Sequence, residues 1–450
     1  MDIKKFKMQI PEYVLAVMNA LLRNGFEAYA VGGCVRDSLL GTPPHDFDLT
    51  TSAAPEQMKR VFADFTVIET GLKHGTLTVK SEGRNVEVTT FRVDGEYSDH
   101  RRPDRVEFTS DLRDDLARRD FTVNAFAYSP QSGLVDEFRG IYDLENRIIR
   151  CVGEPDRRFE EDALRILRGL RFAARLGFSI ERETAGSMIK NRGLLKNVSG
   201  ERIFSELCGI LAGDGETVTR LLLEFREVFA EIIPELEPTF DFDQKSPYHQ
   251  YDVYTHTAKA VGYSANEKNV RLAALFHDIS KPRTFFTDGE GMGHFYGHPE
   301  KSAEIARNTL KRLHADNRTV LSVEKLVRRH DDELLPNEKS VGRMISDIGE
   351  ELFFGLCELK KADLLAHAVA YRNVDGITEA ETLARKLLAQ NKCFSLKQLK
   401  IKGEDILKLG VPFGGQVGKI LETLLEEVVD GKIPNDRNEL LKRAKAIKKP

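Results

Sequence analysis

The chain is poor in the features that mark secreted and membrane proteins. It has no tryptophan and only five cysteines in 450 residues. The cysteines are scattered and odd in number, and no Cys-x-x-Cys pair is present, which excludes a disulfide framework or a cysteine-based zinc site and favours reduced thiols. No apolar run approaches the length of a membrane span, and the first residues lack the apolar core of a signal peptide. We therefore expect a cytoplasmic protein that has no contact with membranes.

Strong charge of one sign is also missing. The formal net charge is -4, with 31% charged and 41% hydrophobic residues, as in an ordinary globular protein. Any binding of nucleic acid must therefore depend on local clusters of basic residues. The length is sufficient for about three domains with sizeable cores.

The stretch at residues 29–50, YAVGGCVRDSLLGTPPHDFDLT, carries the most informative pattern. It predicts a strand, a glycine turn, a short helix, a loop and a second strand that contains Asp46 and Asp48. Residues two apart in a strand point to the same face, so two carboxylates lie side by side and need a cation. Oxygen-only ligands favour Mg²⁺. Gly33 and its neighbour let the backbone approach a phosphate, which Arg36 can grip.

Short alternating runs at 65–69, 75–80 and 85–91 predict a small antiparallel sheet. Glu87 is a candidate third carboxylate in the last of these runs, although an exposed charge on an edge strand is an equally good interpretation. The polar stretch 92–110, with Arg101, Arg102 and Arg105, is longer than a hairpin needs and predicts a functional loop. Next, Arg119 and Asp120 precede a predicted apolar helix around Asn124, where Asp120 could also be a simple cap.

Residues 159–178 predict one strong helix with a basic face. Uncompensated like charges need a partner, and phosphate would serve; the row is formed by Arg165, Arg168, Arg171 and Arg175. Asp162 lies three residues before Arg165, so the two are neighbours. A carboxylate and a guanidinium can together recognise the amine and acceptor that cytosine and adenine share. An ordinary ion pair within the helix is the competing interpretation.

These motifs resemble the class II nucleotidyltransferases, which include the tRNA CCA-adding enzymes and the bacterial poly(A) polymerases. GGCVRDSLLG with DFDLTTSA, RRDFTVNA, and the segment from Glu161 to Arg165 carry the resemblance. It implies that the catalytic residues Asp46 and Asp48 hold Mg²⁺, with Glu87 as the candidate third catalytic carboxylate, and it implies tRNA, CTP and ATP as partners. The nucleotide-binding residues that it implies are Gly33, Arg36, Arg119, Asp162, Arg165, Arg168 and Arg171.

A second constellation lies at 250–370, where most of the histidines occur. His277-Asp278 followed by Ser280-Lys281-Pro282 resembles the signature of HD phosphohydrolases, which usually have Gly at the position of Ser280. The resemblance implies the metal ligands His256, His277, Asp278 and Asp363, with His298 and His330 as the extra histidines of two-metal forms. Mixed imidazole and carboxylate ligands suit Mn, Ni, Fe or Mg better than a closed zinc site. A purely structural domain of this type is the alternative.

The expected fold is α+β. A small nucleotidyltransferase head with a mixed or antiparallel sheet (1–150) precedes an all-helical neck and body that binds RNA (151–240), an HD phosphohydrolase-like domain (241–375) and a helical tail that binds tRNA (376–450). The favoured function is template-independent CCA addition to tRNA, with possible tRNA-repair phosphohydrolase activity. A poly(A) polymerase or an enzyme that adds only A or only CC stays open. So does an HD metal phosphohydrolase with an RNA-binding head, and the oligomeric state is not predicted.

Overall fold

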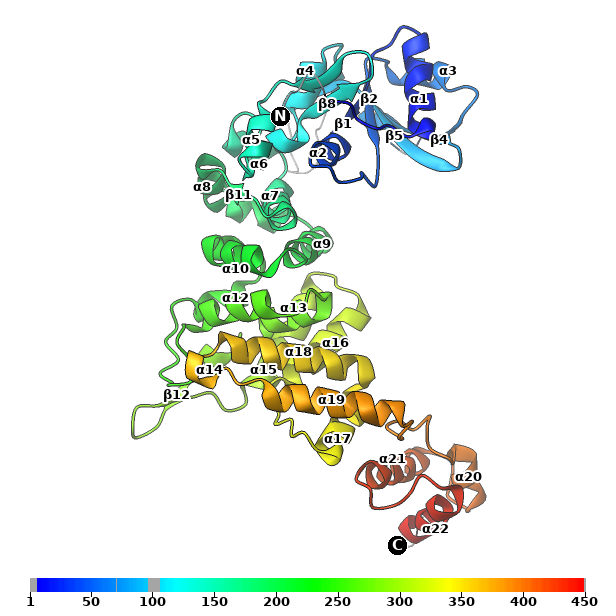
Figure 1. Ribbon diagram of the computed structural model, residues 1–450, viewed down its shortest axis with the longest axis vertical. Coiled ribbons are helices and arrows are strands. Elements are labelled where there is room, and N and C mark those ends of the chain that lie inside the picture. Colours follow the sequence, from blue (N-terminus) through cyan, green and yellow to red (C-terminus); the bar gives the residue numbers. More distant parts are fainter. Residues whose placement is uncertain (1–5, 70, 96–105, 449–450) are drawn as a thin grey trace. The chain divides into compact units, whose positions relative to one another are not determined.

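The computed structural model describes residues 6–69, 71–95 and 106–448. The chain forms two compact units, Met1–Thr217 with Glu224–Pro234, and Val218–Leu223 with Glu235–Pro450. The first unit contains the predicted head and neck, and the second contains the histidine-rich region and the tail (Figure 1). The finer division into four domains stays a prediction. The expected functional loop with Arg101, Arg102 and Arg105 lies outside the described residues.

The largest sheet of the first unit, within the described residues, is mixed and has seven strands. Its order is β3-β4-β5-β2-β1-β8-β9. β2 and β5 are parallel neighbours, whereas the other pairs are antiparallel. Its strands are β1 (Ala28–Val31), β2 (Asp48–Thr51), β3 (Thr66–Ile68), β4 (Thr76–Ser81), β5 (Arg84–Thr90), β8 (Phe126–Ser129) and β9 (Gly133–Asp136). Two-stranded ladders join β6 (Arg92–Asp94) to β7 (Val106–Phe108) and β10 (Ile148–Ile149) to β11 (Ser179–Ile180).

Short helices accompany this sheet, and the first of them shows why they form. In α1, apolar residues recur every three or four positions, and Val14, Val17, Met18 and Leu21 are fully buried. Pro55 begins α3, as expected from its fixed φ at a helix start. The helices of the head are α1 (Glu12–Arg23), α2 (Gly33–Leu39), α3 (Pro55–Val61), α4 (Leu112–Ala117) and α5 (Gly140–Glu145).

One predicted helix of the head is wrong. The apolar stretch around Asn124 forms a single 3-10 turn (Thr122–Asn124) and then strand β8. All four residues of β8 are buried, because β8 lies inside the sheet between β1 and β9. A strand covered on both faces has no polar alternation, so periodicity alone cannot distinguish it from a buried helix.

The predicted continuous helix at 159–178 is also wrong. Helix α6 ends at Glu161, Asp162 is extended (φ -141°, ψ 103°), and α7 begins at Leu164. Gly169 lies inside α7 where a methyl group would collide with Met188 and Phe121, so the position requires glycine. The neck helices are α6 (Pro155–Glu161), α7 (Leu164–Leu176), α8 (Arg182–Lys190), α9 (Gly200–Leu211) and α11 (Arg226–Ile232), and α10 (Gly215–Glu224) contains the boundary between the units.

The second unit is built of helices, with α12 packed on α13 and α18, and α13 packed on α16. A short hairpin joins β12 (Phe286–Thr287) to β13 (Gly293–His294). The last three helices, α20, α21 and α22, pack around a separate apolar cluster, which includes Ile401, Ile406 and Leu424. The helices are α12 (Val253–Tyr263), α13 (Lys268–Phe276), α14 (Lys281–Thr284), α15 (His298–Arg312), α16 (Asn317–Arg329), α17 (Glu338–Ile348), α18 (Glu350–Ala366), α19 (Asp375–Ala389), α20 (Gly403–Lys408), α21 (Gly415–Val429) and α22 (Arg437–Lys448).

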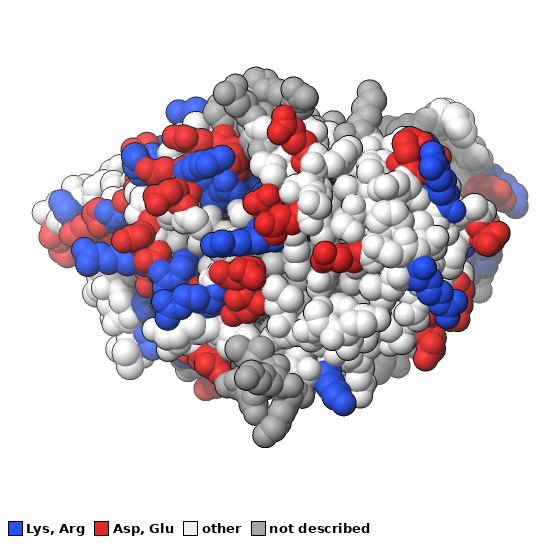
Figure 2. Space-filling model, turned by 90° about the horizontal axis from the view of Figure 1, so that it is seen from above, with Lys and Arg blue, Asp and Glu red and all other residues white. Residues whose placement is uncertain are grey.

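The surface agrees with the low net charge. On the face shown in Figure 2, basic and acidic side chains are interspersed, and no basic stripe is visible. Among the described residues, no helix has both the length and the apolar character needed to cross a membrane.

Candidate active site

The three predicted carboxylates lie where the parallel ladder between β2 and β5 begins. Asp48 is the first residue of β2, and its register partner on β5 is Glu87. Asp46 lies in the bend before β2 and not in the strand itself, and buried Phe47 separates two exposed carboxylates. β5 lies between β4 and β2, so the interpretation of Glu87 as a charge on an edge strand is wrong.

The electrostatics of this group favour a cation. Burial raises the pKa of Asp48, and the charges of Glu87 and Asp46 raise it further, while Arg119 acts in the opposite direction. Three oxygen ligands that repel one another fit a hard divalent ion. In the described part of the chain, the groups of ligand atoms within 4.8 Å of one another all lie in the second unit. The head carboxylates thus form an open site whose members an ion would draw together.

The glycine turn makes room for Arg119. Gly32 has a φ of 75°, and a Cβ atom there would lie 2.8 Å from Nη1 of Arg119. At Gly33 the nearest atom would be Nη2 of Arg36, at an ordinary 3.6 Å. Gly32 is therefore the position that requires glycine, and the nucleotide contact expected at Gly33 stays a prediction. The charge of Arg119 acts on Asp48, burial lowers the pKa of Arg119, and its Nε has no hydrogen-bond partner among the described residues. Its contact with a nucleotide stays a prediction.

Arg36 lies inside the protein and does not face open space. Its Nε and Nη2 atoms donate to Oδ1 of Asp37, and Nη1 donates to Oδ1 of Asn124. The side chain is 3% exposed. Arg36 thus braces helix α2 against the turn at Asn124, and its predicted contact with a phosphate stays a prediction.

The break after α6 changes the surroundings of the predicted base-reading pair. Oδ1 of Asp162 accepts from the backbone N–H of Leu164 at 3.1 Å and so caps α7. Its other oxygen accepts from Arg202 at 3.1 Å. Arg165 donates to Glu161 at 2.7 Å. The two residues are still close, because the backbone N–H of Arg165 donates to the carbonyl of Asp162.

The arginine row on α7 is compensated by carboxylates, contrary to expectation. The ion pairs are Arg165–Glu161 at 2.7 Å, Arg168–Asp120 at 2.7 Å, Arg171–Glu206 at 2.9 Å and Arg175–Asp37 at 3.8 Å. Burial raises the pKa of Asp120, but the charge and hydrogen bonds of Arg168 outweigh burial and hold the pKa below its usual value. The row alone is therefore no argument for a phosphate.

Phe172 gathers three of these guanidinium groups and was missed in the sequence. The ring centre lies 5.3 Å from the guanidinium carbon of Arg36, 5.4 Å from that of Arg168 and 5.1 Å from that of Arg171. Such contacts fix the planes of the arginines. The only signal in the sequence was an aromatic residue next to the basic face of a helix.

The four ligands implied by the HD signature converge in the second unit. Nε2 of His256 lies 2.9 Å from Oδ1 of Asp363 and 3.3 Å from Nε2 of His277. Nε2 of His277 lies 3.2 Å from Oδ2 of Asp278. Helix α12, the turn after α13 and helix α18 supply these residues. Residues more than 100 positions apart thus form one buried cluster, which we call the histidine–aspartate cluster.

The extra histidines join the same cluster through Asp278. Oδ1 of Asp278 lies 3.3 Å from Nε2 of His298 and 3.7 Å from Nε2 of His330, and these two nitrogens are 3.1 Å apart. Nδ1 of each ring contacts a backbone carbonyl, at 2.9 Å for His298 and 2.7 Å for His330. Those contacts place hydrogen on Nδ1, so Nε2 is the atom of each ring that is directed at Asp278 and at the other histidine. Such an arrangement fits a cation.

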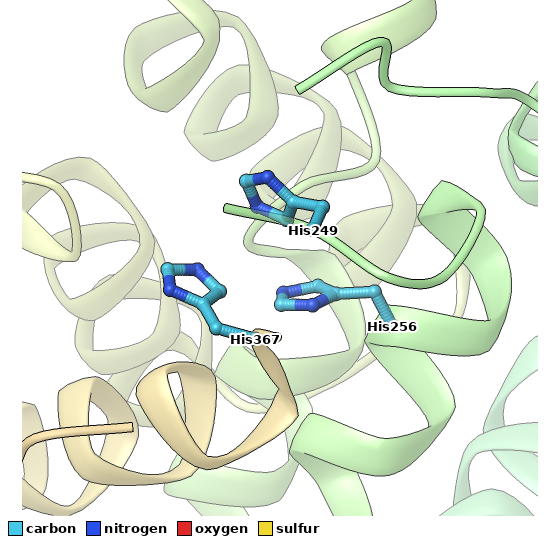
Figure 3. A group of neighbouring side chains, drawn as sticks. All are labelled: His249, His256 and His367. Atoms are coloured by element: carbon cyan, nitrogen blue, oxygen red, sulfur yellow. The ribbon is translucent and has the colours of Figure 1, made fainter. Parts of the chain in front are cut away.

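Two histidines that the sequence did not single out border the cluster (Figure 3). His249, before α12, and His367, after α18, have ring centres 4.6 Å apart, and that of His249 lies 5.2 Å from that of His256. Nζ of Lys281 lies 2.7 Å from Oδ2 of Asp278. A lone histidine carries little signal, but His367 lies one helical turn after Asp363, and that spacing could have indicated it.

The pKa shifts of the histidine–aspartate cluster arise from burial and pairing. Burial lowers the pKa of His277, but the charges of Asp278 and Asp363 outweigh burial and raise it to about 10. Burial, with the charge of Lys281, lowers the pKa of His249 to about 2. Burial raises the pKa of Asp363, yet hydrogen bonds from two histidines hold it well below its usual value.

Comparisons with known proteins point to one family along the chain. Family models described as "Poly A polymerase head domain", "Probable RNA and SrmB- binding site of polymerase A" and "tRNA nucleotidyltransferase domain 2" match residues 28–150, 177–240 and 298–444. A CCA-adding enzyme of Streptococcus thermophilus is 34% identical over 436 residues, covering 96% of each chain. One from Ligilactobacillus salivarius is 32% identical over 98% of this chain and 97% of its own. The Bacillus stearothermophilus CCA-adding enzyme in complex with CTP has a TM-score of 0.72 at 26% identity, covering 98% of both chains.

Proposed function

This chain belongs to the family of CCA-adding enzymes, which are nucleotidyltransferases, and we propose that it adds CCA to the 3′ end of tRNA from CTP and ATP. One observation carries the proposal: a chain similar to these relatives over nearly its whole length brings Asp46, Asp48 and Glu87 to the start of the parallel ladder between β2 and β5. The solved relative that contains CTP supports CTP as a substrate. The five cysteines are free thiols, which supports a cytoplasmic location.

In the proposed mechanism, the three carboxylates hold a divalent cation, Mg²⁺ by the preference of oxygen ligands. An ion held by these carboxylates would supply positive charge to the reacting phosphate. The 3′ hydroxyl of tRNA forms a bond to the α-phosphorus, the bond from that phosphorus to the bridging oxygen breaks, and pyrophosphate leaves. The hydroxyl proton passes to solvent. Ribose and phosphates are held by Gly33, Arg36, Arg119, Arg168 and Arg171.

Asp162 and Arg165 are the proposed base-reading groups. Their present bonds go to Arg202 and Glu161, so each must exchange a protein partner for a base edge. We expect the double variant Asp162→Ala with Arg165→Ala to fold and to lose selection for C and A, as measured by incorporation of each of the four nucleotides. Retained selection would contradict this assignment. Arg157→Ala, on the exposed face of α6, is the control.

The overall function is tested with a tRNA transcript that lacks CCA, Mg²⁺, and CTP or ATP alone or together. We expect CTP alone to add two residues and ATP alone to add one residue to a transcript ending in CC. A growing A tail would identify a poly(A) polymerase, and addition of only A or only CC would identify a partial enzyme. If substitutions at the head carboxylates spare every activity, the head is an RNA-binding module of a phosphohydrolase.

The histidine–aspartate cluster supports a second activity, and we propose that it is a metal-dependent phosphohydrolase acting in tRNA repair. His256, His277, Asp278 and Asp363 would hold Mn, Ni or Fe, with His298 and His330 beside a second ion. The convergence of Nε2 of His298 and Nε2 of His330 beside Asp278 supports this assignment. A bound ion would supply an activated water. Hydrolysis of a 2′,3′-cyclic phosphate with added Mn²⁺ tests the activity.

A further inference from the structure

Helix α4 carries a buried carboxylate that the proposed mechanism does not use. Asp115 is 0% exposed, and the next residue, Leu116, packs with Val31 and Ala127 and so holds α4 against the sheet. A carboxylate is costly to take out of water unless several donors or an opposite charge compensate it. The partners of Asp115 therefore show what its burial achieves.

The partners of Asp115 come from three separate segments. The hydroxyl of Thr50 on β2 donates to Oδ2 at 3.0 Å, and the backbone N–H of Arg92 on β6 donates to Oδ1 at 3.4 Å. Nε of Arg118 donates to Oδ1 at 2.9 Å, and Nη2 of the same guanidinium lies 2.8 Å from it. A carboxylate accepts at both oxygens, whereas an amide accepts at one only. A carboxylate can therefore join all three segments at once.

Thr50 connects Asp115 to the strands of the catalytic carboxylates. Thr50 lies two residues after Asp48 on β2. Its register partner is Thr89, and Glu87 lies two residues before Thr89 on β5. Residues two apart in a strand point to the same face, so the hydroxyl of Thr50 lies on the face of Asp48, one step further along the strand. The hydroxyl also contacts the carbonyl of Thr89 at 3.1 Å. Asp115 thus fixes the two strands directly behind their carboxylates.

The turn after α4 connects Asp115 to two arginines that the proposed function uses. Arg119 follows Arg118 directly, and its Nη1 donates to the carbonyl of Asn124 at 3.4 Å. Burial lowers the pKa of Arg119, and the charge of Asp115 acts against burial. The carbonyl of Arg118 accepts from Nη2 of Arg165 at 3.2 Å. The bond that fixes Arg118 therefore also fixes the backbone that carries Arg119 and holds Arg165.

We propose that Asp115 is a positioning residue of the nucleotidyl-transfer site. Through Thr50 it fixes strand β2, which carries a catalytic carboxylate. Through Arg118 it fixes the segment that carries Arg119 and holds Arg165. Because Asp115 is fully buried, it acts through these groups and not by contact with a nucleotide. A displacement of about 1 Å at such a group can cost on the order of 100-fold in rate. The inference rests on the proposed CCA addition and on the roles proposed for the two arginines.

The test compares Asp115→Asn with Asp143→Asn, which removes a matched buried carboxylate on α5. Asp143 is 1% exposed, accepts from the hydroxyl of Thr122 at 2.7 Å and pairs with Arg150 at 3.1 Å, so its loss should cost stability in the same way. A smaller folded fraction lowers kcat for every nucleotide and leaves KM and the choice of nucleotide unchanged. The full-length chain, Mg²⁺ and tRNA transcripts that lack CCA or end in CC are used for both variants.

We expect Asp115→Asn to raise KM for CTP and for ATP about tenfold and to lower the preference for CTP over UTP about tenfold, because the arginines that hold and read the nucleotide are displaced. Asp143→Asn should leave both quantities as in the wild type. Thr50→Val removes the same connection from its other end and should raise KM about threefold, and Thr50→Ser, which keeps the hydroxyl, should restore it. The Thr50 variants decide the matter if Asp115→Asn does not fold.

Unchanged KM and unchanged preference in Asp115→Asn, or in Thr50→Val where Asp115→Asn does not fold, would overturn the inference. Equal changes in Asp143→Asn would overturn it as well. If the wild type adds no nucleotide, the proposed function fails instead, and equilibrium dialysis with ATP decides on the positioning role. Binding that is weakened by Asp115→Asn and not by Asp143→Asn supports it, whereas equal binding by all three proteins, or no binding by the wild type, excludes it.

Discussion

The head and the histidine–aspartate cluster handle negative charge in opposite ways. In the head, Asp46, Asp48 and Glu87 are exposed residues where the β2–β5 ladder begins, and partial burial of Asp48 with the charges of Glu87 and Asp46 raises its pKa. In the cluster, Asp278 is 1% exposed and surrounded by imidazoles and a lysine. The first site is open and only partly compensated by the charge of Arg119, whereas the second is buried and already paired.

The two sites therefore differ in the partners that complete them. An open group of carboxylates has a cation and a substrate as its missing partners, so its chemistry is completed only when both arrive. A buried, paired cluster is part of the core, and loss of one member leaves another charge unpaired. Substitutions of the three head carboxylates should therefore affect activity with little effect on stability, and substitutions in the cluster should affect both.

The largest expected effect is that of Asp48→Asn on nucleotide addition. We expect the rate to fall by about 10³-fold, or about 4 kcal/mol, because a carboxylate that holds the cation is lost. The unfolding free energy and the hydrolysis of cyclic phosphate should stay as in the wild type. Primer extension on tRNA measures the rate, with the exposed Asp64→Asn as the control. A rate reduced by less than tenfold would contradict the role of Asp48 as a cation ligand in the head site.

The corresponding variant in the histidine–aspartate cluster is Asp363→Asn. It removes the charge that His256 and His277 face, so we expect metal affinity and phosphohydrolase activity to fall by on the order of 100-fold. Nucleotide addition should change less than twofold. Metal content after dialysis and both assays measure this, and Glu358→Gln on the same helix is the control. Equal loss of both activities would mean that the two sites are not separable.

The ion pair of Asp120 and Arg168, in which only Asp120 is buried, should make the stability of the protein depend on pH. The pKa of Asp120 is lowered in the folded state, so its stabilisation is complete above the unfolded value near 3.8 and is lost as pH falls through the lower folded value. Asp120→Asn should therefore flatten the loss of stability below pH 4. At pH 7 it should cost about 2–3 kcal/mol by unpairing Arg168. Urea titrations from pH 2 to 7 measure both, and Asp156→Asn in an exposed pair should change little.

The smallest expected effect separates two adjacent glycines. Gly32→Ala places a Cβ atom against Arg119 at a positive φ, and we expect a loss of about 1–3 kcal/mol of stability. Gly33→Ala meets only Arg36 at 3.6 Å and should be nearly neutral. Thermal unfolding measures the difference. Equal effects of the two variants would contradict the role given to the turn at Gly32.

Patterns in neighbouring residues predicted many strands and turns correctly. They could not predict contacts between residues that are far apart in the sequence. Strand β1 and the turn before α2 follow from an apolar run ended by glycines, and Glu87 was placed beside Asp48 only as a candidate. The helix break at Asp162 has only a weak local signal, because aspartate favours a helix start while Glu161, Ala163 and Leu164 all favour helix. Arg168 and Asp120 are 48 positions apart, so their pairing depends on tertiary structure. The place of His249 beside His256 and His367 could not be predicted for the same reason.

The central claim of the proposed function is that the head adds three nucleotides to tRNA and no more. The most direct test is to sequence the 3′ ends of a tRNA transcript lacking CCA after reaction with this chain, Mg²⁺, CTP and ATP together. The prediction is a single product that ends in CCA and grows no further on long incubation. Products that continue into an A tail, or that stop before the terminal A, would contradict it.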